Sequence, residues 1–299
     1  MAGLISRARR ALMYVPGNDE RKISKAAGLN ADGIILDLED GVSANRKDEA
    51  RVGIQKALQE VNFGRSERLV RINSLASGRA MGDLLAVMPG KPDAILIPKA
   101  DSAAIVQEID SLITEMERDL DIESGRTAII LTIESARAFL DLQAICRSSQ
   151  RVEGLVFGAE DFTADTGITR TLDARELLYA RSQLVMHAAA FGFNAIDMVQ
   201  TNYSDLALLE RECREGAELG FTGKQVIHPA QVEIVQAAFT PSAKLIEYAR
   251  RVMEAAQEAM REGKGAFSLD GQMVDTPVIK RAEKILARAR AAGTIEQVN

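Results

Sequence analysis

Residues 33–41 read Gly33-Ile34-Ile35-Leu36-Asp37-Leu38-Glu39-Asp40-Gly41, an apolar run that passes directly into a cluster of acids. The apolar residues are continuous and do not alternate with polar ones, which is typical of a parallel strand buried on both faces. Runs of this kind, bounded by turn residues, are predicted as eight strands: Ala11–Pro16, Gly33–Leu38, Arg68–Ile72, Ala94–Pro98, Ala128–Ile133, Gly154–Gly158, Asn194–Val199 and Lys224–Ile227.

The segments between these runs have the spacing of amphipathic helices, most clearly Ala103–Leu120 and Leu172–Phe191. Repeated strand-then-helix units predict a parallel sheet, either closed into a barrel or open and doubly wound. An open sheet would be expected to carry a glycine-rich turn after its first strand, and Pro16-Gly17-Asn18-Asp19 lacks the spaced glycines. We therefore expect an α/β fold, a (β/α)8 TIM barrel, as the catalytic domain over residues 1–240.

Residues 241–299 are more than a barrel requires and form a predicted C-terminal extension. Pro241–Glu262 is expected to be a helix with Ser242 as its N-cap, and residues 263–266 break it. Phe267–Val274 is expected to be irregular or a hairpin, and Pro277 to open a last helix through Arg290. We expect this extension to be a lid over the active site of its own or a neighbouring subunit.

Composition excludes several classes of protein. The chain has 46% hydrophobic residues and a formal net charge of −6, so we expect no nucleic-acid partner, which would need a clustered basic surplus. No apolar run approaches the ~20 residues that cross a bilayer. Cys146 and Cys213 have no metal-ligand or disulfide spacing, which favours a reducing compartment. The arginine-rich opening lacks a secretory signal; we expect a cytoplasmic bacterial protein, with the mitochondrial matrix as the alternative if the chain is eukaryotic.

Acidic residues end several of the predicted strands, at the rim where barrel enzymes have their active sites. Glu134 and Asp161 end consecutive apolar strands, so they are predicted to lie close together. Carboxylate oxygens suit Mg²⁺ or Mn²⁺, whereas two histidines and no cysteine pair make zinc an unsuitable choice. The alternative is that either acid caps the helix that follows it.

Two cations are predicted near this rim. Arg71 lies in the apolar run Leu69–Asn73 and is suited to grip a carboxylate or an oxyanion; its alternative role is a structural ion pair with Asp37 or Glu39. Lys99 could instead form a Schiff base, as in another kind of aldolase. A bound divalent cation would supply the same electrophilic help.

Several motifs together resemble one family, the HpcH/HpaI aldolase and citrate lyase β-subunit superfamily. They are Tyr14–Asn18, Leu36–Gly41, Val70–Asn73, Ile133–Ser135 and Phe157–Phe162. Gly220–Pro229 and Gly263–Phe267 are similar to a branch whose members act on citramalyl-CoA. The resemblance covers nearly the whole chain.

The resemblance implies a TIM barrel, Mg²⁺ on Glu134 and Asp161, and Arg71 in contact with the 2-oxo acid or the carbonyl that becomes an enolate. It also implies a homotrimer in which Asp275, on the extension, is catalytic in a neighbouring subunit's site. The positions that it implies for CoA binding are Tyr14, Arg21, Lys25, Arg46, Gln225 and Val226. At Arg21 the branch carries lysine, which keeps the charge and leaves the detailed contacts open.

The expected activity is Mg²⁺-dependent cleavage of (S)-citramalyl-CoA, or of a related 3-hydroxyacyl-CoA such as malyl-CoA, into acetyl-CoA and pyruvate or glyoxylate. This is a retro-Claisen-type carbon–carbon lyase reaction. Three different functions stay open: the β subunit of an acyl-carrier-protein-dependent citrate lyase, a class II aldolase acting on free 2-oxo-4-hydroxy acids, and a non-catalytic acyl-CoA-binding protein. The extension and the basic CoA positions favour a stand-alone CoA enzyme.

Overall fold

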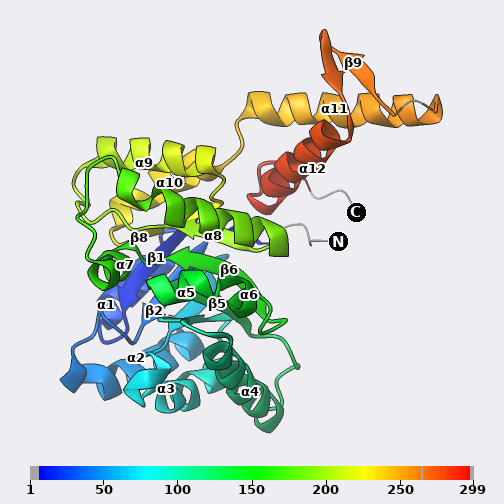
Figure 1. Cartoon of the computed structure of the whole chain (residues 1–299). Coiled ribbons are helices and arrows are strands. Elements are labelled where there is room, and N and C mark those ends of the chain that lie inside the picture. Colours follow the sequence, from blue (N-terminus) through cyan, green and yellow to red (C-terminus); the bar gives the residue numbers. More distant parts are fainter. Residues whose placement is uncertain (1–6, 264, 297–299) are drawn as a thin grey trace. The chain divides into compact units, whose positions relative to one another are not determined.

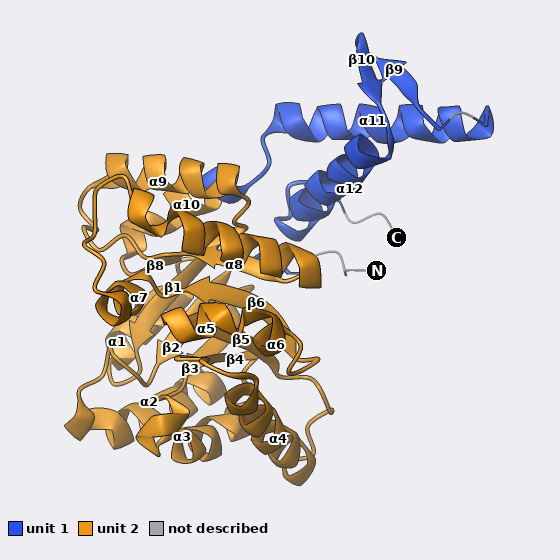
Figure 2. Ribbon diagram, in the orientation of Figure 1, with its two compact units in different colours: residues 1–8, 238–299 blue, residues 9–237 orange. Residues whose placement is uncertain are grey.

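The computed structural model describes residues 7–263 and 265–296. Residues 1–6, which carry most of the opening used to predict the compartment, and Lys264 of the Gly263–Phe267 motif lie outside the described residues. The chain divides into two compact units (Figure 2). The barrel unit comprises Arg9–Ala237; the terminal unit comprises the described residues before Arg9 and those from Ala238 onward.

Eight parallel strands close into a barrel, in the order in which they occur in the chain, so the predicted TIM barrel is confirmed (Figure 1). Their bounds are β1 Ala11–Pro16, β2 Gly33–Asp37, β3 Glu67–Arg71, β4 Ala94–Ile97, β5 Ala128–Ile133, β6 Val152–Phe157, β7 Asn194–Asp197 and β8 Gly223–Val226. The predicted bounds of β1 and β5 agree with the structure, and the other six strands differ from it by one or two residues at one or both ends.

Helices surround the strands in Figure 1 and connect each strand to the next. The α-helices of the barrel are α1 Glu20–Ala27, α2 Lys47–Glu60, α3 Ala80–Val87, α4 Ala103–Asp119, α5 Ala136–Leu140, α6 Leu142–Cys146, α7 Ala159–Thr166, α8 Leu178–Phe191, α9 Leu206–Leu219 and α10 Pro229–Phe239. Short 3-10 turns are η1 Ala44–Arg46, η2 Leu75–Ser77, η3 Met88–Gly90 and η4 Arg175–Leu177.

The predicted start of a helix at Leu172 is wrong, because α8 begins at Leu178. The Glu176 carboxylate accepts a hydrogen bond from the backbone N–H of Thr171 at 3.1 Å, and Ala174 has a φ of 49°. Side chains that bond to nearby backbone compete with helical hydrogen bonding. The segment before α8 therefore folds as a local turn.

Alternate strand residues point into the barrel, where they form an apolar core below the carboxyl ends of the strands. The buried members of this core are Leu12, Ile35, Leu69, Ala94, Leu96, Ala128, Ile130, Val156 and Ile196, with Tyr14 packed against them. The next inward residues along several strands are polar. The apolar core thus supports a polar layer at the end of the barrel where a site is expected.

The terminal unit has a core of its own. Helix α11 (Ala243–Arg261) has Ser242 as its N-cap, as predicted, and the Ser242 hydroxyl accepts from the backbone N–H of Leu245 at 3.3 Å. Strands β9 (Phe267–Leu269) and β10 (Gln272–Val274) form the hairpin, and α12 (Thr276–Ala291) follows. Their shared core contains Ile246, Ala249, Val252, Val274, Ala282, Leu286 and Ala289.

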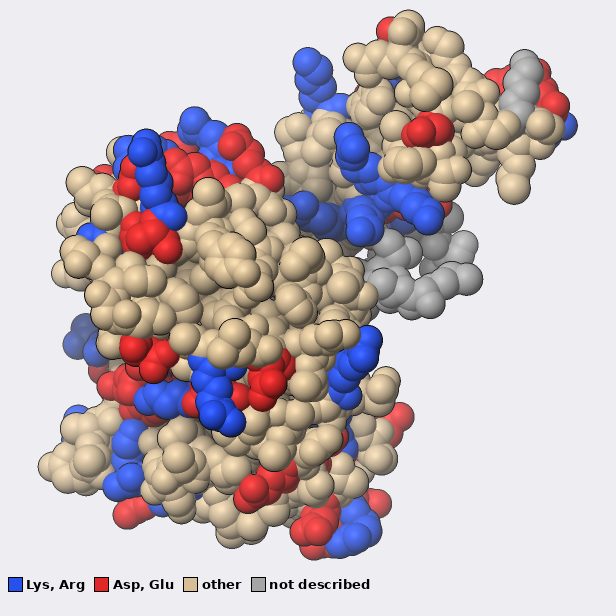
Figure 3. Space-filling model, in the orientation of Figure 1, with Lys and Arg blue, Asp and Glu red and all other residues tan. Residues whose placement is uncertain are grey.

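The distribution of charge and the character of the helices can be compared with the composition. On the face of the barrel unit shown in Figure 3, lysines and arginines are interspersed with acids. Within the described ranges no helix is both long and apolar enough to cross a membrane.

Candidate active site

A cavity of about 360 Å³ opens at the carboxyl ends of the barrel strands. Its lining residues come from strands or strand-following loops on several sides of the barrel: Tyr14, Pro16, Asp37, Asp40, Gly41, Arg71, Thr132, Glu134, Phe157, Gly158, Ala159, Glu160, Asp161, Val199, Gln225 and Ile227. Of the sequence-predicted site residues, the structure brings together Tyr14, Arg71, Glu134, Asp161 and Gln225.

Glu134 is a buried carboxylate directly after β5. The backbone N–H of Lys99 donates to its Oε1 at 2.6 Å. Burial raises the pKa of Glu134 to about 8, and the nearby negative charges of Asp161 and Glu39 add to the effect. The residue beside it must be small, since a Cβ on Gly158 would lie 2.4 Å from Glu134 Oε2. The structure therefore holds an acid where its charge is costly unless a cation is present.

Lys99, which carries this N–H, has a φ of 50°, a left-handed conformation that is unfavourable for a residue with a side chain. Such conformations often occur at functional sites, where the surroundings hold them in place. Its Nζ lies 3.6 Å from Glu39 Oε1 and is partly exposed. The described contact of Lys99 with Glu134 is thus made by its backbone, and its ammonium group faces an acid.

Asp161 lies in the first turn of α7, beside Glu134 at the end of the neighbouring strand. Neither acid is an N-cap: Gly158 occupies that position before α7, and Ser135 caps α5 by accepting from the N–H of Ala138. N-capping of the following helix by Glu134 or Asp161 is therefore wrong, although Asp161 has the position in the first turn of α7 that favours an acid. Both carboxylates line the cavity.

The residues present fit a magnesium ion. No group of three or more His, Cys, Asp or Glu side chains with metal-binding geometry occurs among the described residues. Mg²⁺ does not need one, because it keeps several waters and takes one or two carboxylates with substrate oxygens. Glu134 has one oxygen engaged by Lys99 and a second toward Gly158, and its raised pKa marks a place where a cation would stabilise the ionised form.

Arg71 forms the structural ion pair that was one of its two roles predicted from the sequence, the other being the binding of an anion. Its Nε and Nη2 donate to the two oxygens of Asp37, each at 2.7 Å, and Nη1 lies 3.3 Å from Glu39 Oε2. The guanidinium also lies 4.9 Å from the centre of the Tyr14 ring. Arg71 nevertheless lines the cavity, so a structural pair and a contact with a ligand do not exclude each other.

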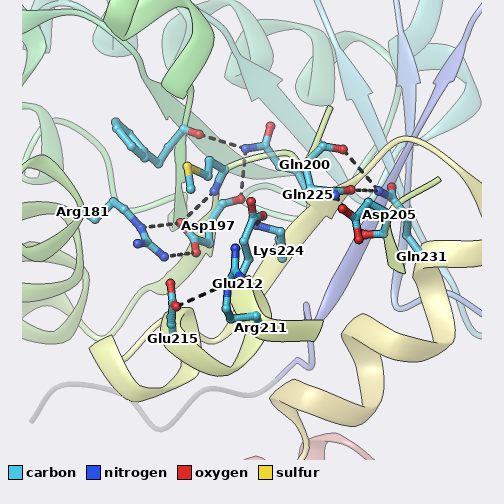
Figure 4. Close-up of polar contacts among 12 residues, drawn as sticks. Arg181, Asp197, Gln200, Asp205, Arg211, Glu212, Glu215, Lys224, Gln225 and Gln231 are labelled. Atoms are coloured by element: carbon cyan, nitrogen blue, oxygen red, sulfur yellow. Dashed lines mark hydrogen bonds and ion pairs between the residues drawn. The ribbon is translucent and has the colours of Figure 1, made fainter. Parts of the chain in front are cut away.

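Gln225, on the inward face of β8, links consecutive strands on one side of the barrel interior. Its amide donates to the carbonyls of Phe157 at 2.9 Å and Asp197 at 3.1 Å, and Figure 4 shows Gln225 beside Asp197. Its Oε1 accepts from the Tyr14 hydroxyl at 3.0 Å. Val226, the next residue, is fully buried and has the opposite orientation along β8, away from the barrel interior.

Outside the barrel wall, the residues next to Gln225 and Ile196 form ion pairs with the surrounding helices. Asp197 of β7 accepts from Arg181 of α8, and Lys224 of β8 lies 3.0 Å from Glu212 of α9 (Figure 4). These pairs attach β7 and β8 to their helices, behind the strand that carries Gln225.

The predicted phosphate-binding cations lie outside the cavity. Arg21 and Lys25 are exposed on α1, and Arg46 is exposed at the end of η1. Arg46 donates to Glu49 at 2.7 and 2.6 Å. None of the three lines the cavity.

Asp275 belongs to the terminal unit. It is the N-cap of α12, and its side chain accepts from the backbone N–H of Val278 at 3.4 Å. A capping role for this acid is thus present in the structure. Its catalytic role stays a prediction.

The cavity also contains residues that the sequence does not single out as site residues. The sequence indicates Asp37 only as a partner of Arg71, and it gives no role to Thr132. Thr132 precedes Glu134 by two residues on the same strand, so the alternation of β-strand side chains could have placed both in the cavity.

The fold and the cavity define a (β/α)8-barrel enzyme with an acidic active site. Residues 10–229 match the HpcH/HpaI aldolase/citrate lyase family. The chain is 40% identical over 291 residues to the mitochondrial citramalyl-CoA lyase of Homo sapiens, covering 94% of this chain and 85% of the human one. The chain belongs to the HpcH/HpaI aldolase/citrate lyase family and is a lyase.

Two further similarities bear on the function. Citrate lyase subunit beta of Leuconostoc mesenteroides subsp. cremoris is 40% identical over 285 residues, covering 95% of this chain and 94% of the subunit. A solved structure of protein CitE from Mycobacterium tuberculosis, in complex with magnesium, acetoacetate and coenzyme A, has a TM-score of 0.74 and 32% identity. It covers 96% of this chain, which covers 98% of it in turn.

Proposed function

We propose that this protein cleaves (S)-citramalyl-CoA into acetyl-CoA and pyruvate in a reaction that depends on Mg²⁺. The observation that carries the proposal is the buried Glu134 beside Asp161, in a cavity that Arg71 also lines. The human relative named citramalyl-CoA lyase supports the substrate, and the magnesium, acetoacetate and coenzyme A bound to the Mycobacterium protein support the cofactor and the class of ligand. Mn²⁺ is expected to replace Mg²⁺, since both prefer oxygen ligands.

The reaction makes three chemical demands. The tertiary hydroxyl must lose its proton, its carbon must become the ketone of pyruvate, and the electrons of the broken carbon–carbon bond must pass into the enolate of the acetyl thioester. The enolate then takes a proton at its methyl carbon. A divalent cation held by Glu134 and Asp161 would supply a Lewis acid for the oxygens of the substrate.

The protein's own groups meet the remaining demands. Arg71, fixed by Asp37, is placed to stabilise negative charge as it develops on an oxygen, since a donor that is held before the reaction needs no reorganisation. Asp275 is proposed to give the enolate its proton, and to remove it when the reaction runs in reverse. A lid that excludes water would protect the enolate.

The rival with specific support is the β subunit of citrate lyase. The extension does not separate the two functions, because the Leuconostoc subunit aligns over 95% of this chain, which includes most of residues 241–299. The extension therefore gives no reason to prefer a stand-alone CoA enzyme. The exposed cations Arg21, Lys25 and Arg46 remain in favour of a free CoA thioester, whose phosphates they would meet.

An aldolase and a non-catalytic binding protein have less support. An aldolase for free 2-oxo-4-hydroxy acids needs no cations for CoA, and a protein that only binds acyl-CoA needs no pair of carboxylates in its cavity. The homotrimer, the catalytic barrel of residues 1–240, the lid of residues 241–299 acting in a neighbouring site and the cellular compartment stay predictions.

The test compares (S)- and (R)-citramalyl-CoA, malyl-CoA, citryl-CoA and a citryl thioester of acyl carrier protein under the same conditions. We expect the highest kcat/KM for (S)-citramalyl-CoA. Malyl-CoA, which lacks one methyl group, should be within about 10–200-fold, since one methyl is worth about 1–3 kcal/mol. A preference for the carrier-protein thioester would instead support the citrate lyase subunit.

A further inference from the structure

The floor of the cavity is a layer of polar side chains, most of which are already engaged. Tyr14 donates to Gln225, and Gln225 donates to two backbone carbonyls. Arg71 and Asp37 bind each other through two hydrogen bonds. A ligand that reaches this floor therefore meets groups that already have protein partners.

Thr132 is different. The residue is 3% exposed, it lines the cavity, and its hydroxyl oxygen has no hydrogen-bond partner among the described residues. It lies two residues before Glu134, so both side chains point into the barrel. Its methyl carbon is near Gly158, at 3.1 Å from where a Cβ on that glycine would lie. A few other buried side-chain atoms of the described residues also have no hydrogen-bond partner, but their residues do not line this cavity.

A buried hydroxyl without a partner destabilises the protein that contains it. Valine would fill nearly the same volume on this strand without that penalty, and it suits a β-strand at least as well. Unsatisfied buried polar groups in folded proteins call for an explanation, and one explanation is that a ligand completes the hydrogen bond.

The size of the cavity limits which part of the substrate reaches Thr132. A volume of about 360 Å³ suits a small group and not a whole acyl-CoA. The cations proposed for the CoA phosphates are exposed outside it. The part of the substrate at the floor is then the small 2-oxo acid half.

The charges of the cavity indicate which atom needs this donor. Asp37, Glu134 and Asp161 line the cavity, and Asp37 occupies two of the guanidinium nitrogens of Arg71. A carboxylate that enters such a place needs donors that are not already taken. An uncharged hydroxyl supplies one without adding a further charge to bury.

We infer that the Thr132 hydroxyl donates a hydrogen bond to a carboxylate oxygen of the 2-oxo acid half of the substrate. Thr132 is thus a substrate-binding residue at the cavity floor. The inference rests on the proposed function, because that function supplies a 2-oxo acid, pyruvate, as the product released there.

The test measures pyruvate binding by calorimetry at a fixed, saturating Mg²⁺ concentration. Thr132→Val should raise the Kd for pyruvate about tenfold, as expected for one lost hydrogen bond. Its melting temperature should equal or exceed that of the wild type. Thr132→Ser, which keeps the hydroxyl, should bind pyruvate within about threefold of the wild type.

Thr127 provides the matched control. Its hydroxyl is also buried without a partner in the described chain, but it lies before β5 and does not line the cavity. Thr127→Val should also keep or raise the melting temperature, while the Kd for pyruvate stays unchanged. If Thr132→Val folds poorly, Thr132→Ser is compared with Thr132→Ala, and the hydroxyl effect should again be about tenfold.

The outcomes separate this inference from the function on which it rests. Tight pyruvate binding by the wild type and an equal Kd for Thr132→Val would overturn the inference alone. Absence of pyruvate binding by the wild type would overturn both the inference and the proposed function. The assignment is supported if Thr132→Val binds pyruvate more weakly than the wild type, while Thr132→Ser and Thr127→Val bind it about as tightly as the wild type.

Discussion

Arg71 and Asp37 bind each other at paired positions of neighbouring strands, with Nε–Oδ1 and Nη2–Oδ2 distances of 2.7 Å each. Asp37 also accepts the backbone N–H groups of Glu39 and Gly41, at 2.8 Å each. One carboxylate therefore fixes both the arginine of the cavity and the loop that follows β2.

Replacement of this carboxylate tests its role. Asp37→Asn leaves a mostly buried guanidinium without its main anionic partner, and the loss of one member of such a pair typically costs about 3–5 kcal/mol. We expect a fall of that order in the free energy of unfolding, measured with urea, and at least a tenfold fall in kcat. Glu49→Gln, which removes the partner of exposed Arg46, is the stability control and should leave the melting temperature unchanged. Equal stability of Asp37→Asn and the wild type would contradict this account.

Glu39 should make stability depend on pH in the metal-free protein. Burial raises the pKa of Glu39 from 4.5 to about 7, in spite of the opposing charge of Arg71. The folded state holds the proton on the Glu39 carboxyl more tightly than the unfolded state does. The stability that this proton contributes is therefore fully present below about pH 4.5 and is lost as the pH rises through about 7. Glu39→Gln keeps the group neutral, so its melting temperature relative to the wild type should rise between pH 5 and 8. A difference in melting temperature between Glu39→Gln and the wild type that does not change with pH would contradict a raised pKa of Glu39.

The exposed cations Arg21, Lys25 and Arg46 should act in binding and not in the chemical step. Reversal of all three to glutamate is expected to raise the KM for the CoA thioester at least tenfold with kcat nearly unchanged, as when uniform binding is lost. Arg118→Glu, on the exposed end of α4, is the control for a general effect of charge. An unaltered KM in the triple variant would indicate that these three residues are solvated surface charges with no role in CoA binding.

One substitution can separate the two roles of Asp275, the helix cap seen in the structure and the predicted proton transfer. Asparagine caps a helix about as well as aspartate, so Asp275→Asn should keep the melting temperature. An amide cannot transfer the proton, and kcat should fall about 10²–10⁴-fold. A near-normal kcat would leave only the cap that the structure shows.

The proposed oligomer can be examined with the same variant. If the extension serves a neighbouring site, mixed oligomers of Asp275→Asn and Glu134→Gln protomers should recover some activity. No recovery in verified mixed oligomers would indicate that each extension serves its own barrel.

Much of the fold can be predicted because parallel barrel strands are buried on both faces and are therefore continuous in apolar residues. Ala128–Ile133 is predicted with its correct bounds for this reason. Helix starts are harder to predict. The start at Leu178 depends on the contact of Glu176 with Thr171, which hydrophobic spacing does not report.

The site is predictable as a set of strand-end residues and less so as a set of contacts. Glu134 and Asp161 line one cavity, as their positions shortly after consecutive strands indicate. The backbone contact of Lys99 with Glu134 depends on a φ of 50° at Lys99, which lysine does not favour and no sequence pattern signals. The family resemblance implies a CoA contact for Tyr14, yet its hydroxyl donates to Gln225 on the neighbouring strand β8.

The most direct test of Mg²⁺-dependent cleavage measures the pyruvate and acetyl-CoA released from (S)-citramalyl-CoA by the wild type and by Glu134→Gln, with Mg²⁺ and with EDTA. We expect equal amounts of the two products from the wild type with Mg²⁺. We expect no turnover with EDTA, recovery when Mg²⁺ is restored, and at least a 10²-fold loss in Glu134→Gln, whose buried carboxylate is replaced by a neutral amide. Full activity after exhaustive chelation would contradict the metal site and direct attention to a Schiff base on Lys99. An intact thioester, or free CoA without pyruvate, would contradict the proposed lyase reaction itself.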